Sequence, residues 1–217
     1  GELQHAPELD LSIYTEHAEA EQILKHALGD SHAELKLQFE TDIQRTFRVM
    51  HFEDTEIEVS LDVGEVRTAT AQHAMHEVEF ELKSGSVHSL LAFSFEWVKK
   101  YQLWLDVRSK AEIGHLLARQ QTVSPASICK EFTLSKKDAA NKNLRLLIAQ
   151  QLQHLLPNIA AISAQVAEKE HIQQAQLALE HLHLTLLLFK DWNAAIADKW
   201  AMQIGAFKQQ FEHLQHL

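Results

Sequence analysis

The sequence predicts an α+β protein in which a strand-rich first region is followed by a region of helices. Segments in which apolar and polar residues alternate recur through the first region, a pattern typical of half-buried strands. After Pro125 no such segment recurs, and apolar residues return at helical spacing instead. The charge changes at the same place, because residues 1–124 carry a net charge of −11 and residues 125–217 a net charge of +1.

The first region is expected to form an antiparallel sheet with a few helices. An amphipathic stretch ends at Gly29, which marks the end of the first helix. Glu53 and Asp54 lie between two strand-like runs and are expected to form a hairpin turn. The predicted strands cover residues 8–14, 35–52, 55–62, 75–83 and 103–106. The predicted helices cover residues 19–28, 86–101 and 109–119.

Four apolar stripes at helical spacing follow Pro125. The first runs from Leu144 to Leu156 and is expected to end at Pro157, because proline lacks the backbone donor that a helix interior needs. The other three begin at Ile159, at residue 171 and at Ile196. Together they predict an antiparallel bundle with short connections.

Acidic residues occupy alternate positions in two of the predicted strands. The acids of one strand are Glu77, Glu79 and Glu81, and those of the other are Glu56, Glu58 and Asp62. Because successive side chains of a strand point to opposite faces, each row lies on one face. Such a row is either the solvated face of an antiparallel sheet or the wall of a site for a hard divalent cation. Spacing alone favours the solvated face.

Three stretches of the first region carry motifs that are more specific together than separately. They are FETDIQRTFRV (39–49), IEVSLDVGEV leading into HEVEFELKSG (57–85), and SKAEIGHLLA (109–118). In this order they resemble the CYTH family, the triphosphate tunnel metalloenzymes. Arg45 matches the phosphate-binding arginine of the family, and Lys110 matches the lysine of its terminal motif. Asp62 matches an acidic residue ahead of a turn glycine.

The resemblance implies a domain over residues 1–120 whose antiparallel strands form a charged tunnel, or barrel. It implies metal-dependent hydrolysis of inorganic triphosphate or a related triphosphate, with Mg²⁺ or Mn²⁺ as the cofactor. Arg45 and Lys110 would bind phosphate, with no separate catalytic residue. The implied metal ligands are Glu77, Glu79, Glu81 and Asp62. Two departures make the chain a partial copy: the opening strands of the family are absent, and Ile113 replaces an arginine.

The helical region, residues 125–217, resembles the start of a CHAD domain. The resemblance lies in HIQQAQLALEHLHLTLLLF at 171–189, which closes with Phe189. The polyphosphate binding of that family relies on dense positive charge. Because Gln176 and Glu180 stand at two of its basic positions, polyphosphate is a weaker expectation than triphosphate. The alternative function is a noncatalytic module for binding phosphate or polyphosphate, or for another interaction.

Other classes of function are disfavoured by composition. The acidic first region lacks the clustered Lys and Arg that nucleic-acid binding needs, and no apolar run reaches membrane-spanning length. No secretory leader opens the sequence and Cys129 is the single cysteine, which fits a cytoplasmic protein with an inert thiol. Among fifteen histidines, His181 and His183 do not share a helix face, and His213 and His216 are read as a chance pair.

Overall fold

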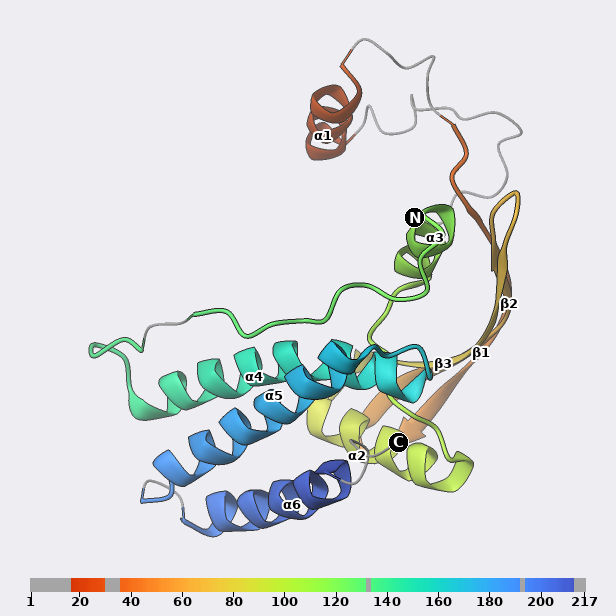
Figure 1. The fold of residues 1–217 in the computed structure, drawn as a ribbon. Coiled ribbons are helices and arrows are strands. Elements are labelled where there is room, and N and C mark those ends of the chain that lie inside the picture. The colour runs from red at the N-terminus through yellow and green to blue at the C-terminus, as the bar shows by residue number, and fades with distance from the viewer. Residues whose placement is uncertain (1–16, 30–35, 132–133, 192–193, 213–217) are drawn as a thin grey trace. The chain divides into compact units, whose positions relative to one another are not determined.

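A computed structural model describes residues 17–29, 36–131, 134–191 and 194–212 of the chain (Figure 1). The contacts divide the chain into two compact units, residues 1–38 and residues 39–217. In the first unit the described structure is helix α1 (Ala18–Leu28), which ends at Gly29 as predicted. The strand predicted at 8–14 lies outside the described residues.

The second unit contains a three-stranded antiparallel sheet in the order β1-β2-β3 (Figure 1). The strands are β1 (Glu40–Phe52), β2 (Thr55–Arg67) and β3 (Gln72–Ser84), close to three of the predicted ones. Glu53 and Asp54 form the turn between β1 and β2, as predicted, and Glu53 adopts a left-handed conformation with a φ of 54°. The central strand β2 is bonded to a neighbour along both of its sides.

The sheet is open rather than closed, because β1 and β3 are its two edges. A tunnel or barrel requires every strand to pair on both sides. The strands of the described residues do not meet this requirement. The α+β class is therefore confirmed, whereas the closed barrel implied by the CYTH resemblance is not present in the described part of the chain.

One face of the sheet is apolar and is covered by helix α2 (Val87–Tyr101). The helix begins after Ser86, whose hydroxyl accepts a hydrogen bond from the backbone of His88. The ring centroid of Phe93 lies 5.5 Å from that of Phe52 and 6.0 Å from that of Phe80. These contacts between aromatic rings hold α2 on the sheet.

Helix α3 (Lys110–Ala118) packs on the opposite face, near one end of the sheet. Its Ile113 forms a small core with Val66 and Met75. Gly114 permits the close approach, because a Cβ atom at this position would lie 2.2 Å from the ring of Phe39. This packing fixes the start of the helix, and with it Lys110, above the sheet.

The strand predicted at 103–106 is wrong, since none of the described ladders includes these residues. The backbone amide of Leu103 instead bonds to the carbonyl of Val98 and completes the end of α2. Asp106 bonds through its side chain to the backbone amide and the guanidinium of Arg108. The hydrogen bonds that complete the end of α2 and the turn at Asp106 therefore determine the conformation of this segment, in place of the predicted strand.

Three helices follow in the described residues: α4 (Ala140–Ser163), α5 (Lys169–Leu188) and α6 (Ala194–Glu212). The predicted helix end at Pro157 is wrong, because α4 continues through that residue. Proline leaves the carbonyl of Gln153 without its helical donor, and the hydroxyl of Ser127 donates a hydrogen bond to this carbonyl at 3.4 Å. Two of the four predicted stripes therefore belong to one helix.

Helix α5 contacts both α4 and α6. One core cluster of this region consists of Leu155, Ala175, Ala178, Leu179 and Phe211. The CHAD-like bundle stays a prediction. No helix of the described residues is long and apolar enough to cross a bilayer.

Asn158 ties the segment before α4 to that helix. Its side chain is fully buried, accepts a hydrogen bond from the amide of Ser127 at 3.0 Å and donates one to the carbonyl of Ser127 at 2.9 Å. We expect Asn158→Ala to lower the free energy of unfolding by about 2–3 kcal/mol, because both backbone groups lose their partner. Urea unfolding followed by circular dichroism measures the change.

The matched control is Asn141→Ala at the exposed start of α4. We expect it to change the free energy of unfolding by less than about 0.5 kcal/mol, as is usual at the surface. Equal effects of the two substitutions would contradict the role assigned to Asn158.

Candidate functional site

Three residues that face one another across neighbouring strands form the sheet side of the site. Arg45 of β1 lies directly opposite Asp62 of β2, and Asp62 lies directly opposite Glu77 of β3. Residues that face each other across antiparallel strands project from the same side of the sheet. Glu79 projects from the same side as Glu77, because it lies two positions further along β3. This is the face on which α3 packs.

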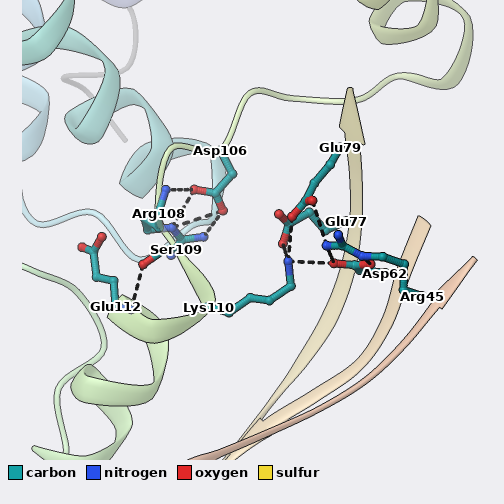
Figure 2. Close-up of polar contacts among 9 residues, drawn as sticks. All are labelled: Arg45, Asp62, Glu77, Glu79, Asp106, Arg108, Ser109, Lys110 and Glu112. Atoms are coloured by element: carbon teal, nitrogen blue, oxygen red, sulfur yellow. Dashed lines mark hydrogen bonds and ion pairs between the residues drawn. The ribbon is translucent and has the colours of Figure 1, made fainter. Parts of the chain in front are cut away.

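Lys110 reaches the same place from outside the sheet (Figure 2). It is the first residue of α3, and the preceding Ser109 caps that helix by accepting a hydrogen bond from the amide of Glu112. The turn before the helix is held by the ion pair of Arg108 with Asp106, with 2.8 Å between Nη2 and Oδ2. The cap and the ion pair together set the position from which Lys110 extends.

Asp62 is the centre of the site, and its side chain is fully buried. Arg45 binds it with two parallel hydrogen bonds, Nε to Oδ1 and Nη2 to Oδ2, both 2.7 Å long. The Nζ of Lys110 lies 2.8 Å from Oδ2 of the same carboxylate. A buried carboxylate needs such partners, and the paired geometry of arginine is the strong form of this interaction.

The same two cations also bind the glutamates of β3 (Figure 2). Lys110 Nζ lies 3.2 Å from Oε2 of Glu77 and 2.9 Å from Oε1 of Glu79. Arg45 Nη2 lies 2.8 Å from Oε2 of Glu79. We call these five residues, Arg45, Asp62, Glu77, Glu79 and Lys110, the charged cluster. With three carboxylates and two cations it carries a formal charge of −1.

The pKa of Asp62 is lowered, chiefly because Arg45 hydrogen-bonds to its charged form and despite the opposing effect of burial. The pKa of Lys110 is raised. Burial alone would lower that pKa, but the hydrogen bonds to Asp62, Glu79 and Glu77 outweigh burial and favour the charged ammonium. Both residues are therefore charged at neutral pH.

The two glutamates differ in pKa although they are two residues apart. The pKa of Glu77 is raised, chiefly by burial, and the hydrogen bond from Lys110 only partly offsets this. Burial is also the largest effect on Glu79, but hydrogen bonds from Lys110 and Glu77 lower its pKa on balance. Of the two, Glu77 is therefore the one that holds a proton more readily.

Glu81, the remaining predicted metal ligand, is not in the charged cluster. It pairs with Lys83, at 3.2 Å between Oε1 and Nζ, and Lys83 also lies 3.4 Å from Oε2 of Glu58. The structure thus brings together five of the six predicted site residues and separates Glu81 from them. The roles of all six in binding metal or phosphate remain predictions.

The cluster offers carboxylate oxygens, the donors that Mg²⁺ and Mn²⁺ prefer. The side chains of Glu77 and Glu79 are 29% and 39% exposed, so solvent and ions reach them. Asp62 is buried and bonded through both oxygens. The donor set therefore fits a hard cation at Glu77 and Glu79, with Asp62 suited to holding the two cationic side chains.

A second group of polar residues was not apparent from the spacing in the sequence. Ligand atoms of Cys129, His154 and His181 all lie within 4.8 Å of one another. These residues are far apart in the chain, so their meeting depends on how α4 and α5 pack. One available signal was His154, which falls within a stripe of buried residues on α4.

Asp62→Asn is expected to lower the free energy of unfolding by about 2–3 kcal/mol at neutral pH, because it leaves two cations beside a neutral amide. The pH dependence gives a sharper test. A lowered pKa means that the carboxylate stabilises the fold above its unfolded pKa of about 3.9, and this contribution is lost as the pH falls through the lower folded pKa. Urea unfolding of both proteins across this range measures the difference.

The difference between the two proteins should narrow as the pH falls below about 4. A difference that does not change with pH would contradict the account of Asp62. The control is Glu81→Gln, whose exposed side chain lies outside the charged cluster. At neutral pH this substitution should change the free energy of unfolding by less than about 0.5 kcal/mol.

The glutamates should respond to neutralisation in opposite ways. Because the pKa of Glu77 is raised, the fold prefers its neutral form and loses stability as the pH rises above the unfolded value of about 4.3. Glu77→Gln should therefore leave stability at neutral pH unchanged or increase it. Glu79→Gln should decrease it, because its pKa is lowered. Each change should stay within about 1 kcal/mol by thermal or urea unfolding, and reversed signs would contradict the account.

Part of the chain is similar to a known protein. No family model matches the sequence. The chain is 36% identical over 83 residues to a protein of Haemophilus influenzae named inorganic triphosphatase. The matched stretch is 38% of this chain and 24% of that protein, so the chain spans about a quarter of the relative it matches. The similarity relates part of the chain to a triphosphatase.

Proposed function

We propose that the chain carries part of the site of a metal-dependent triphosphatase of the CYTH type, acting on inorganic triphosphate or a related triphosphate. One observation carries the proposal. Arg45 and Lys110, from a strand and from a helix 65 positions later in the chain, converge on the carboxylates of β2 and β3. The partial identity to a protein named inorganic triphosphatase supports the same substrate class.

In this proposal Arg45 and Lys110 bind the phosphates. Arg45 presents a planar fork of donors that matches two phosphate oxygens, and Lys110 supplies a compact charge with three donors. Both side chains reach solvent, at 37% and 20% exposure. A polyanion at this face would compete with Glu79, which is bound to both cations, while buried Asp62 keeps them in position.

Glu77 and Glu79 are the proposed ligands of Mg²⁺ or Mn²⁺. When bound, such an ion neutralises charge on the phosphate oxygens and orients them for attack by water. The higher pKa of Glu77 makes it the carboxyl that must lose a proton before it binds a cation. Loss of activity toward low pH would follow from this step.

A noncatalytic phosphate-binding or interaction module is the second candidate. It is favoured by the open sheet of the described residues, because an open face surrounds a polyphosphate less fully than a tunnel does. Positioning and charge neutralisation dominate phosphoryl transfer, so a partly enclosed substrate can be bound without being hydrolysed. Polyphosphate binding by the helical region has weaker support, because that region has a net charge of only +1.

Binding and turnover are measured separately, by calorimetric titration of tripolyphosphate and by release of inorganic phosphate, each with Mg²⁺ or Mn²⁺. We expect Lys110→Ala to weaken binding about 10- to 100-fold, as is typical when a hydrogen bond to a charged group is lost. Lys83→Ala is the control, since Lys83 pairs with Glu58 and Glu81 outside the charged cluster. The Lys83→Ala chain should bind tripolyphosphate with the same affinity as the unsubstituted chain.

Binding that needs Lys110 together with phosphate release supports the triphosphatase. Binding that needs Lys110 without release, in this chain and in any longer protein that contains it, supports the noncatalytic module. Equal affinities of Lys110→Ala and Lys83→Ala would show that phosphate does not bind at the charged cluster.

A further inference from the structure

A second polar cluster lies in the helical region and shares no residue with the charged cluster. It combines Cys129, from the segment before α4, with His154 of α4 and His181 of α5. One ligand atom of each residue lies within 4.8 Å of those of the other two. A thiol and two imidazoles from three separate segments are thus gathered in one place.

The segment that carries Cys129 is held against both helices. Its Ser127 is bonded through the amide and the carbonyl to the buried side chain of Asn158 on α4. The carbonyl of Ser124 accepts a hydrogen bond of 3.0 Å from Nε2 of His171 on α5. Cys129 therefore follows an anchored backbone, and its position next to the two histidines is a consequence of the fold.

His154 is prepared to act as a ligand. Its side chain is only 2% exposed, and Nε2 lies 2.9 Å from Oε1 of Gln174. Because that oxygen can only accept, Nε2 carries the proton and Nδ1 of the neutral ring has a free lone pair. No hydrogen-bond partner for this buried Nδ1 exists among the described residues. A second ring nitrogen held by a hydrogen bond is the usual way in which proteins orient a metal-binding histidine.

Gln151 adds another buried acceptor on the same helix. It lies three positions before His154, is 1% exposed, and its Oε1 also has no partner among the described residues. Nδ1 of His154 and Oε1 of Gln151 both present lone pairs, and neither atom is a hydrogen-bond donor. Leaving two such atoms buried is costly, so the site favours an electropositive species.

Cys129 and His181, the other two members of the cluster, lie beside a cavity. Cys129, Gln151 and His181 line a mainly apolar cavity of about 630 Å³ together with leucines of α4 and α5. The thiol of Cys129 donates to the carbonyl of Lys130 over 3.7 Å, a long contact that is readily given up. The cluster thus has one buried side, at His154, and one side that faces a cavity.

We propose that Cys129, His154 and His181 bind a Zn²⁺ ion. A thiolate with two imidazoles is a set of soft and borderline ligands that suits zinc, in contrast to the oxygen donors of the charged cluster. Tetrahedral bonds of about 2.3 Å to sulfur and 2.0–2.1 Å to nitrogen place the ligand atoms about 3.4–3.6 Å apart. Because the ligand atoms lie within 4.8 Å of one another, each pair must close by at most about 1.4 Å. Rotation of the Cys129 and His181 side chains supplies this closure.

Binding requires one proton to leave. The S–H bond of Cys129 breaks, the sulfur binds zinc, and the proton passes to the solvent, while both imidazoles bind as neutral rings. Three protein ligands leave a fourth position for water, the arrangement of sites that stay open. Such a water would be a hydrogen-bond donor for Oε1 of Gln151, which lines the same cavity as Cys129 and His181.

The test uses the reduced, metal-stripped chain titrated with Zn²⁺ against a chromogenic chelator. We expect one ion per chain, with binding weakened at least about 100-fold by Cys129→Ser and by His154→Leu. His183→Leu is the matched control, because His183 also has a buried Nδ1 without a partner among the described residues but is not in the cluster. It should bind zinc as the unsubstituted chain does.

Co²⁺ identifies the ligands by spectroscopy. The charge-transfer absorption of a cobalt thiolate should appear with the unsubstituted chain and with His183→Leu, and should be absent with Cys129→Ser. Gln174→Leu should keep the absorption and weaken binding about 10- to 100-fold, because Gln174 orients His154 without touching the ion. Excess Mg²⁺ should not displace either metal, which separates this site from the charged cluster.

A further measurement does not depend on whether the variants fold. Zn²⁺ should protect Cys129 of the unsubstituted chain from alkylation. Binding of less than one ion per chain, a cobalt spectrum without thiolate absorption, or a thiol that Zn²⁺ does not protect would each overturn the proposal. The buried acceptors would then be satisfied by water.

Discussion

The buried carboxylate of Asp62 is the interaction on which the site depends. It binds Arg45 of β1 and Lys110 of α3. Lys110 also binds Glu77 and Glu79 of β3, and Arg45 also binds Glu79. Removing a buried charge from water is costly unless partners replace the solvent. The hydrogen bonds and ion pairs that stabilise buried Asp62 also place Arg45 and Lys110 next to the accessible carboxylates of Glu77 and Glu79. The pairing of the buried Asp62 carboxylate thus stabilises the fold and also assembles the charged cluster.

The packing of α3 is the second requirement, since Lys110 has to arrive from outside the sheet. Gly114 lets the helix lie close to Phe39, and Ile113 fills the core at Val66. Ile113 stands where the CYTH resemblance places an arginine, and here it is 6% exposed. The residue contributes to the packing of α3 on the sheet.

The sequence was sufficient for features that depend on local patterns. Alternation predicted β3 and the shared face of Glu77 and Glu79, and the turn at Glu53 followed from its position between two strands. The pairing of Asp62 opposite Glu77 could not be read from spacing, because strand register depends on contacts between strands.

Features that depend on distant partners were missed or wrong. Helix α4 continues through Pro157 because the hydroxyl of Ser127 donates a hydrogen bond to the carbonyl of Gln153, which proline leaves without its helical donor. The proposed zinc ligands, Cys129, His154 and His181, come together only when α4, α5 and the preceding segment pack. The association of Lys110 with the sheet was anticipated from family resemblance, since no local pattern connects a helix start to a strand face.

A crystal structure of the chain with tripolyphosphate and Mg²⁺ would show whether phosphate and a cation bind at the charged cluster. We expect phosphate oxygens within hydrogen-bond distance of the Arg45 guanidinium and the Lys110 ammonium, and a cation at Glu77 and Glu79. We also expect Asp62 still to hold both cationic side chains. Phosphate bound elsewhere on the chain, with the charged cluster unchanged, would contradict the proposed function.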